Sequence, residues 1–79
     1  MNSLDQILYL LQELIEDGTT PKSVQQKLTQ SIKILKEQGP LPVNISKIMY
    51  EIEAITEDTN LPSFARTQLF NVAGLLETL

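Results

Sequence analysis

The sequence predicts an all-α protein, a four-helix up-and-down bundle built from two similar helical hairpins. Apolar residues recur at the helical period in four segments and nowhere alternate as they would in strands. Glycine and proline separate these segments. A chain of 79 residues supports one small core. We therefore expect a single domain over residues 1–79, with repeat halves at about 1–39 and 42–79.

The first helix is expected over about residues 4–17, because Gly18 is a typical C-terminal stop. The second is expected to follow Thr20 as its N-cap, to start at Pro21 and to end before Gly39-Pro40. Their apolar faces are expected to comprise Leu4, Ile7, Leu8, Leu11, Leu14, Ile15, Val24, Leu28, Ile32 and Leu35.

The third helix is expected to begin near Pro42 or Asn44, and the fourth is expected to begin at Pro62. Both carry an apolar stripe at helical spacing. The expected core residues are Ile45, Ile48, Met49, Ile52, Ile55, Ala65, Leu69, Val72, Leu75 and Leu76.

An internal repeat relates the two hairpins. Pro21 and Pro62 lie 41 positions apart, and the same offset pairs Tyr9 with Tyr50. It also pairs the apolar stripes and two Glu-Asp dipeptides with each other. Stripes of similar period can align by chance, but prolines, tyrosines and acidic pairs at one common offset indicate a duplicated helical hairpin.

Composition excludes several chemistries. The chain has no Cys and no His, which excludes zinc fingers, iron–sulfur clusters, disulfides and a histidine general base. The net charge of −4 argues against strong nucleic-acid binding. No apolar run approaches ~18 residues, so we expect no membrane span. The start of the sequence lacks the pattern of a secretory signal. We therefore expect a cytoplasmic protein that is not an enzyme and holds no cofactor.

The stretch from Glu57 to Thr67, Glu-Asp-Thr-Asn-Leu-Pro-Ser-Phe-Ala-Arg-Thr, resembles the hallmark of an archaeal group of short helical proteins, uncharacterised protein family zero-one-four-seven. That hallmark reads approximately Asp-Pro-Asn-Met-Pro-x-x-Ala-Arg-Thr and is followed by an apolar helix ending in a Leu-Leu-Glu-like segment. Thr59 stands where the family usually has proline, and Lys22 and Gln25 stand where it commonly has arginine. The resemblance implies a four-helix up-and-down bundle and implies no activity.

The sharpest cluster in the sequence is Asp58, Asn60, Pro62 and Arg66, around the start of the fourth helix. In the structural interpretation, which we favour, Asn60 caps the helix and Asp58 pairs with Arg66 across the loop. In the functional interpretation, the cluster is a small anion site or partner site at a helix N-terminus.

Two further alternatives remain open. Lys22, Lys33 and Lys36 span only about 60° of the second helix, so this weak basic face suits RNA or an RNA-associated complex. The repeated dipeptides Glu16-Asp17 and Glu57-Asp58 could hold a hard metal ion if both lie at one end of the bundle, in a metal protein or a carboxylate-dependent enzyme. Charged residues at these places are more often solvated helix faces and helix ends.

Four apolar side chains lie outside the predicted core. Tyr9 and Tyr50 each lie about 160° from the centre of their helix's apolar stripe, and Ile34 and Phe70 are also off their stripes. Tyrosine is common at protein interfaces, and clustered exposed apolar residues mark them. We therefore expect a second apolar surface on the first and third helices, joined by the second and fourth. The leading hypothesis is a non-catalytic interaction module that forms a homodimer or binds another protein.

Overall fold

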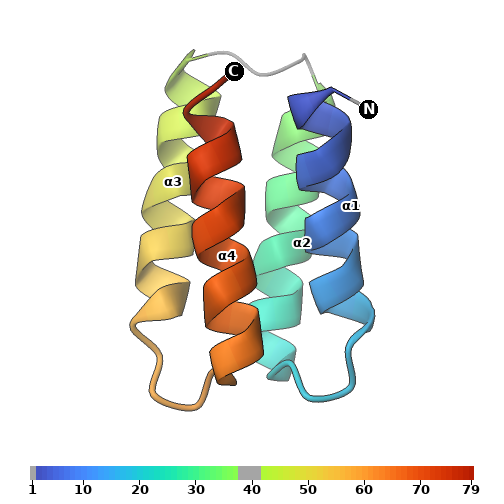
Figure 1. Ribbon diagram of the computed structural model, residues 1–79, viewed down its shortest axis with the longest axis vertical. Coiled ribbons are helices and arrows are strands. Elements are labelled where there is room, and N and C mark those ends of the chain that lie inside the picture. Colours follow the sequence, from blue (N-terminus) through green and yellow to red (C-terminus); the bar gives the residue numbers. More distant parts are fainter. Residues whose placement is uncertain (1, 38–41) are drawn as a thin grey trace.

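The computed structural model describes residues 2–37 and 42–79, and these form four α-helices (Figure 1). Their bounds are α1 Ser3–Glu16, α2 Lys22–Glu37, α3 Pro42–Thr56 and α4 Ser63–Leu76. The molecule measures 31 × 23 × 20 Å along its principal axes. The all-α prediction is confirmed. The predicted stop of the second helix at Gly39-Pro40 lies outside the described residues.

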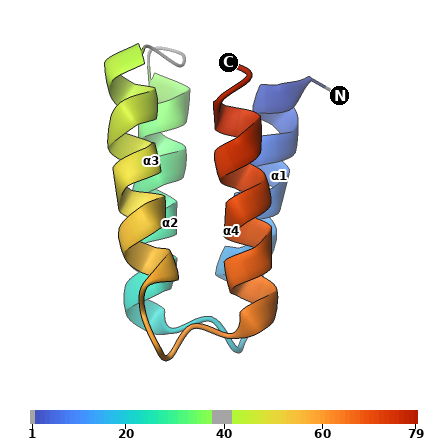
Figure 2. The same ribbon diagram turned by 60° about the vertical axis from the view of Figure 1, so that its left-hand side comes forward.

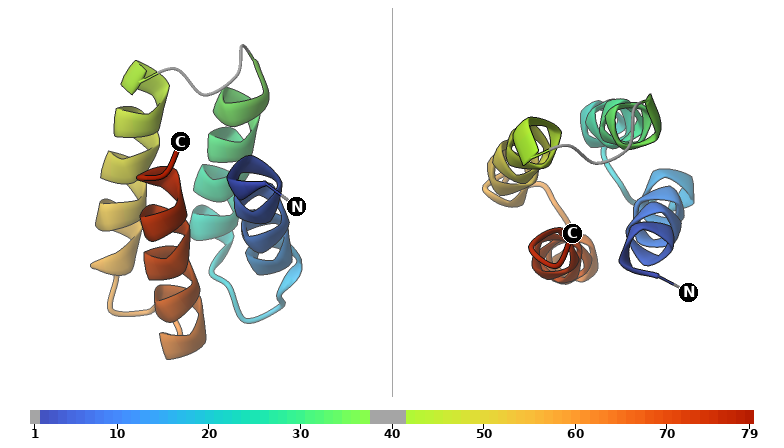
Figure 3. Two further views of the ribbon diagram at one scale, coloured as in Figure 1. Left: turned by 45° about the horizontal axis from the view of Figure 1, so that its top comes forward. Right: turned by 90° about the horizontal axis from the view of Figure 1, so that it is seen from above.

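The helices run up and down around a closed ring. Each helix contacts two neighbours, so that α1 packs on α2 and α4, and α3 also packs on α2 and α4 (Figure 3). The pairs α1/α3 and α2/α4 are therefore diagonal. Both hairpin loops lie at one end of the bundle, and the two chain ends lie together at the other (Figures 1 and 2).

The core lies where the four apolar stripes meet on the bundle axis. Every residue expected to face inward is buried or packed against the buried cluster. Leu61, in the second hairpin loop, adds a buried side chain that the stripes do not include. The buried part of the core comprises Ile7, Leu11, Leu14, Val24, Leu28, Leu35, Ile48, Ile52, Ile55, Leu61, Ala65, Leu69, Val72 and Leu76.

Helix caps depart from the sequence-based expectation. Thr20 does not cap α2, because its Oγ1 is buried and has no hydrogen-bond partner. Asn60 does not cap α4 either, since Pro62 occupies the N-cap position and makes no side-chain cap bond. Instead, the carbonyls of Pro21 and Pro62 accept the first helical hydrogen bonds, from the amides of Gln25 and Arg66. The two hairpins thus begin their second helices in the same way.

Within residues 2–37 and 42–79, none of the helices combines the length and the apolar character needed to span a bilayer.

Candidate functional site

The motif loop between α3 and α4 is closed by Arg66. Its Nε donates to the carbonyl of Thr56 at 3.0 Å, and its Nη2 donates to the carbonyl of Asp58 at 3.0 Å. The Asp58 carboxylate instead accepts the amide of Asn60 at 2.8 Å. The expected Asp58–Arg66 side-chain pair is therefore replaced by bonds from the guanidinium to backbone carbonyls. These bonds give the motif a structural role, because Arg66 ties the last turn of α3 to the loop that follows.

The first hairpin closes its loop with the same geometry and a different side chain. Gln25, which is 41 positions before Arg66, donates from Nε2 to the carbonyls of Ile15 at 3.0 Å and Asp17 at 3.4 Å. The Asp17 carboxylate accepts the amide of Thr19 at 2.8 Å, as Asp58 accepts that of Asn60. A neutral amide thus makes the contacts that a guanidinium makes in the other half.

The acidic pairs Glu16-Asp17 and Glu57-Asp58 do lie at the same end of the bundle (Figure 1). In the described part of the chain, no three carboxylates gather as a metal site would require. The pKa of Asp17 is lowered, first because the hydroxyl of Thr19 donates to its carboxylate and then because the Thr19 amide does so. Of these four acids, Asp17 and Asp58 accept hydrogen bonds within their loop turns.

The off-stripe apolar residues do not form one surface. Tyr9, Tyr50 and Phe70 are well exposed, whereas Ile34 is half-buried against the core. Tyr9 is on α1 and Tyr50 is on α3, and these helices are diagonal, so their outward faces point in opposite directions. The expectation of a single surface shared by the first and third helices is therefore wrong.

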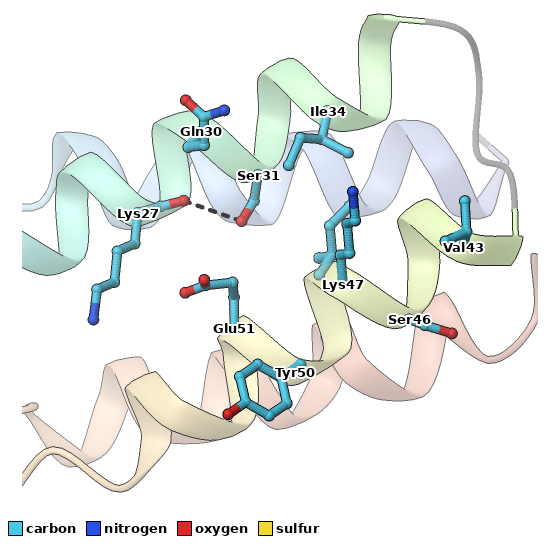
Figure 4. Close-up of a pocket in the computed structure, with 10 residues that line it drawn as sticks. Lys27, Gln30, Ser31, Ile34, Val43, Ser46, Lys47, Tyr50 and Glu51 are labelled. Atoms are coloured by element: carbon cyan, nitrogen blue, oxygen red, sulfur yellow. Dashed lines mark hydrogen bonds between the residues drawn. The ribbon is translucent and has the colours of Figure 1, made fainter.

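Two of those residues, Ile34 on α2 and Tyr50 on α3, both line a groove between these helices (Figure 4). The groove has a volume of about 500 Å³ and is mostly apolar. Its walls are very exposed, with 74% of Tyr50 and 60% of Val43 accessible. The α2–α3 groove, as we call it below, is lined by Lys27, Gln30, Ser31, Ile34, Val43, Ser46, Lys47, Ile48, Tyr50 and Glu51.

Comparison of the two halves explains why this groove is open. The 41-residue offset carries the α1–α4 interface onto the α2–α3 interface. At the first interface, Val72 is fully buried and Leu10 packs against the core. Their counterparts in the groove are Ser31 and Glu51. Two aliphatic side chains that fill one interface are thus replaced by a short hydroxyl and a charged carboxylate, and α2 and α3 contact each other less than α1 and α4 do.

A polar residue seals the α1–α4 interface further. Gln68 is buried, and its Nε2 donates to the carbonyl of Leu10 at 3.2 Å and to Glu13 Oε1 at 2.9 Å. Its counterpart on α2 is Lys27, which is exposed at the edge of the α2–α3 groove. The apolar stripes of the sequence could not predict the groove, because each helix taken alone shows a complete core face. The sequence signal that could have predicted the groove is that apolar residues at the α1–α4 interface have polar residues at the equivalent repeat positions on α2 and α3.

The lysines predicted as a basic face lie elsewhere. Lys22, Lys33 and Lys36 are exposed on α2, and none of them lines the groove. At ~100° per residue they lie roughly 130° around the helix from the groove residues.

Comparison with known proteins places the chain in a family. The model of an uncharacterised protein family, UPF0147, matches residues 1–79. The chain belongs to this family. A UPF0147 protein of Thermoplasma volcanium is 32% identical over 79 residues, which cover 99% of this chain and 89% of that protein. One of Methanopyrus kandleri is 38% identical over 69 residues, which cover 86% of this chain and 66% of that protein.

Two solved structures agree with the bundle described above. The crystal structure of a UPF0147 protein from Thermoplasma acidophilum superposes with a TM-score of 0.90 at 28% identity, over 98% of this chain and 92% of that one. A second crystal structure, of a protein of unknown function, gives a TM-score of 0.86 at 29% identity, over 98% and 89% of the two chains. UPF0147 is a family of unknown function, so membership itself assigns no activity to the groove.

Proposed function

We propose that this UPF0147 protein is a non-catalytic protein–protein interaction module whose binding surface is the α2–α3 groove. The observation that carries the proposal is that the interface between α1 and α4 is closed by aliphatic side chains, whereas its repeat counterpart between α2 and α3 is open. Ser31 itself is buried, whereas Tyr50 and Val43 on the groove walls are exposed, and an apolar side chain from another protein surface would cover these walls.

The shape of the groove favours a protein over a small molecule. Small-molecule sites enclose most of their ligand, typically about 70–90% of its surface. Walls as exposed as Tyr50 and Val43 cannot enclose a ligand in this way. A tyrosine beside aliphatic residues, with charged groups at the margin, is instead the composition of a protein interface.

Site-specific photo-crosslinking tests the proposal. A photoreactive phenylalanine analogue replaces Tyr50 in one version of the protein and Tyr9, its repeat counterpart, in the control. Both positions are exposed on the outward faces of their helices, so both tolerate the change. Illumination in lysate of the native host should give a discrete protein adduct from position 50 and none of comparable yield from position 9.

A second substitution decides whether the adduct depends on the groove. Val43→Asp places a charge on the groove wall, and it is compatible with α3 because an acidic residue in the first turn suits the helix dipole. The adduct from position 50 should be lost in this variant. Equal adducts from positions 9 and 50, or an adduct that survives Val43→Asp, would contradict the groove as the binding surface.

A further inference from the structure

We infer that the occupant of the α2–α3 groove is a second copy of this chain. The inference rests on the proposed function and specifies its partner. The two copies pair about a two-fold axis parallel to the helices, so that α2 of each copy faces α3 of the other. In this dimer, Tyr50 of each copy packs against α2 of its mate, at the level of Ser31.

The register of the helices sets Tyr50 and Ser31 at the same level along the bundle. Gln68 bonds to Glu13, and the Thr78 Oγ1 donates to Ser3 Oγ at 2.9 Å, which together fix how α4 lies along α1. The repeat transfers this register to α2 and α3, where it sets Ser31 level with Tyr50. Figure 4 shows both at the same part of the groove. A two-fold axis parallel to the helices keeps every residue at its level, so Tyr50 of the second copy faces α2 at the level of Ser31, whose own side chain is buried.

Two of the three charged residues that line the groove are self-complementary across such an axis, and the third is Lys47 on α3. Lys27 on α2 and Glu51 on α3 lie towards the same end of the groove, and the Glu51 carboxylate points across towards α2 (Figure 4). When α2 of one copy faces α3 of the other, Lys27 meets Glu51 of the second copy, and the reverse pair forms by symmetry. A face with charges of one sign would repel its own copy. These two residues give the face one charge of each sign on opposite helices.

The available area is sufficient for such a dimer. A stable interface of standard size buries about 800 Å² per partner. That is roughly a sixth of the 4875 Å² accessible surface of the chain. A face made by two of the four helices can supply this area, and Ile34 and Val43 add apolar contact beside the tyrosine.

Sedimentation velocity of the purified chain, from about 1 to 100 μM, tests the inference. This range brackets the Kd of a dimer of moderate affinity, so both monomer and dimer are detected. The unmodified chain should sediment as a monomer–dimer mixture that shifts to dimer with concentration. Tyr50→Ser should weaken dimerisation about 30-fold, as expected for a central interface tyrosine. Tyr9→Ser should leave it unchanged. Circular dichroism checks that both variants keep their helices.

A charge exchange tests the two-fold pairing itself. Lys27→Glu and Glu51→Lys should each weaken the dimer, because each places like charges opposite one another at both symmetry-related contacts. The double variant restores opposite charges at both contacts and should recover dimerisation. Failure of the double variant to recover, with both single variants weakened, would overturn the proposed pairing.

The outcomes separate this inference from the proposed function. A monomer at every concentration overturns the second copy as occupant. If position 50 nevertheless gives a groove-dependent adduct to a different protein, the interaction module stands with another partner. If no groove-dependent adduct forms either, both the inference and the proposed function fail.

Discussion

One side chain in each hairpin, Arg66 or Gln25, reaches back from the second helix to close the loop before it. Each donates to two carbonyls at the end of the preceding helix, where intrahelical partners have run out. What the position requires is therefore a donor that reaches two carbonyls, which both an amide and a guanidinium provide. The positive charge of Arg66 is a secondary property of this contact.

This interpretation predicts how Arg66 tolerates substitution. Arg66→Ala should lower the free energy of unfolding by about 1–2 kcal/mol, since two hydrogen bonds to half-buried carbonyls are lost. Arg66→Gln should lose less than half of that, because Gln25 shows that an amide at the equivalent position makes the same bonds. Urea denaturation of both variants measures the difference. Equal losses would mean that the charge, rather than the donor geometry, stabilises the loop.

Asp17 gives a prediction about pH. Its carboxylate accepts the hydroxyl and the amide of Thr19, and these bonds lower its pKa below the usual value. A folded-state pKa below the unfolded value contributes stability above the unfolded pKa, and that contribution is lost as the pH falls through the folded pKa. In Thr19→Val, which keeps only the amide, an NMR titration should show the Asp17 pKa move back towards its ordinary value. An unmoved pKa would assign the shift to the amide alone.

Helix caps mark the limit of sequence-based prediction for single residues. Thr20 and Asn60 are residue types that favour N-caps, and both precede a proline. In the fold, however, each hairpin loop contains a turn in which an aspartate carboxylate, of Asp17 or Asp58, accepts the backbone amide two residues ahead. After that turn, the Thr20 side chain is buried. Propensity identified residues suited to capping, and the path of the loop decided which role they took.

For whole helices, the apolar stripes predicted the core well and could not predict the groove. Stripe width on a single helix reports how much of its circumference is buried. Whether two helices close on each other depends on matched side chains from both, as with Val72 and Leu10 against Ser31 and Glu51. This information is distributed over two segments of the chain and requires knowledge of which helices are neighbours.

Filling the floor of the groove should stabilise the monomer. Ser31→Val gives α2 the residue that α4 has at Val72, and burial of the added apolar atoms contributes about 0.8 kcal/mol. Urea denaturation in a Tyr50→Ser background measures this without a contribution from dimerisation. The reverse change at the closed interface, Val72→Ser, should cost about 2 kcal/mol because it removes packing and buries a hydroxyl. A destabilised Ser31→Val variant would show that the floor has no room for a methyl group.

At the scale of the molecule, the duplication was the most informative feature of the sequence. The common offset of the prolines and tyrosines predicted two equivalent hairpins, and the loop hydrogen bonds recur at that offset. Equivalence did not predict where the tyrosines would lie relative to one another. In a ring of four helices the first and third are diagonal, so equivalent outward residues are carried to opposite sides of the bundle.

The first and last helices lie side by side, and Thr78 near the end of the chain donates a hydrogen bond to Ser3 near its start. The bundle is also made of two equivalent hairpins. The order in which the halves are translated is therefore of little consequence to the bundle. A circular permutant that joins residue 78 to residue 3 through a short glycine linker, and opens the chain between α2 and α3, would run α3, α4, α1, α2. It should fold to the same bundle, with an unchanged helical circular dichroism spectrum and a cooperative urea transition. In such a chain the walls of the groove would come from the first and last helices, with no loop joining them directly.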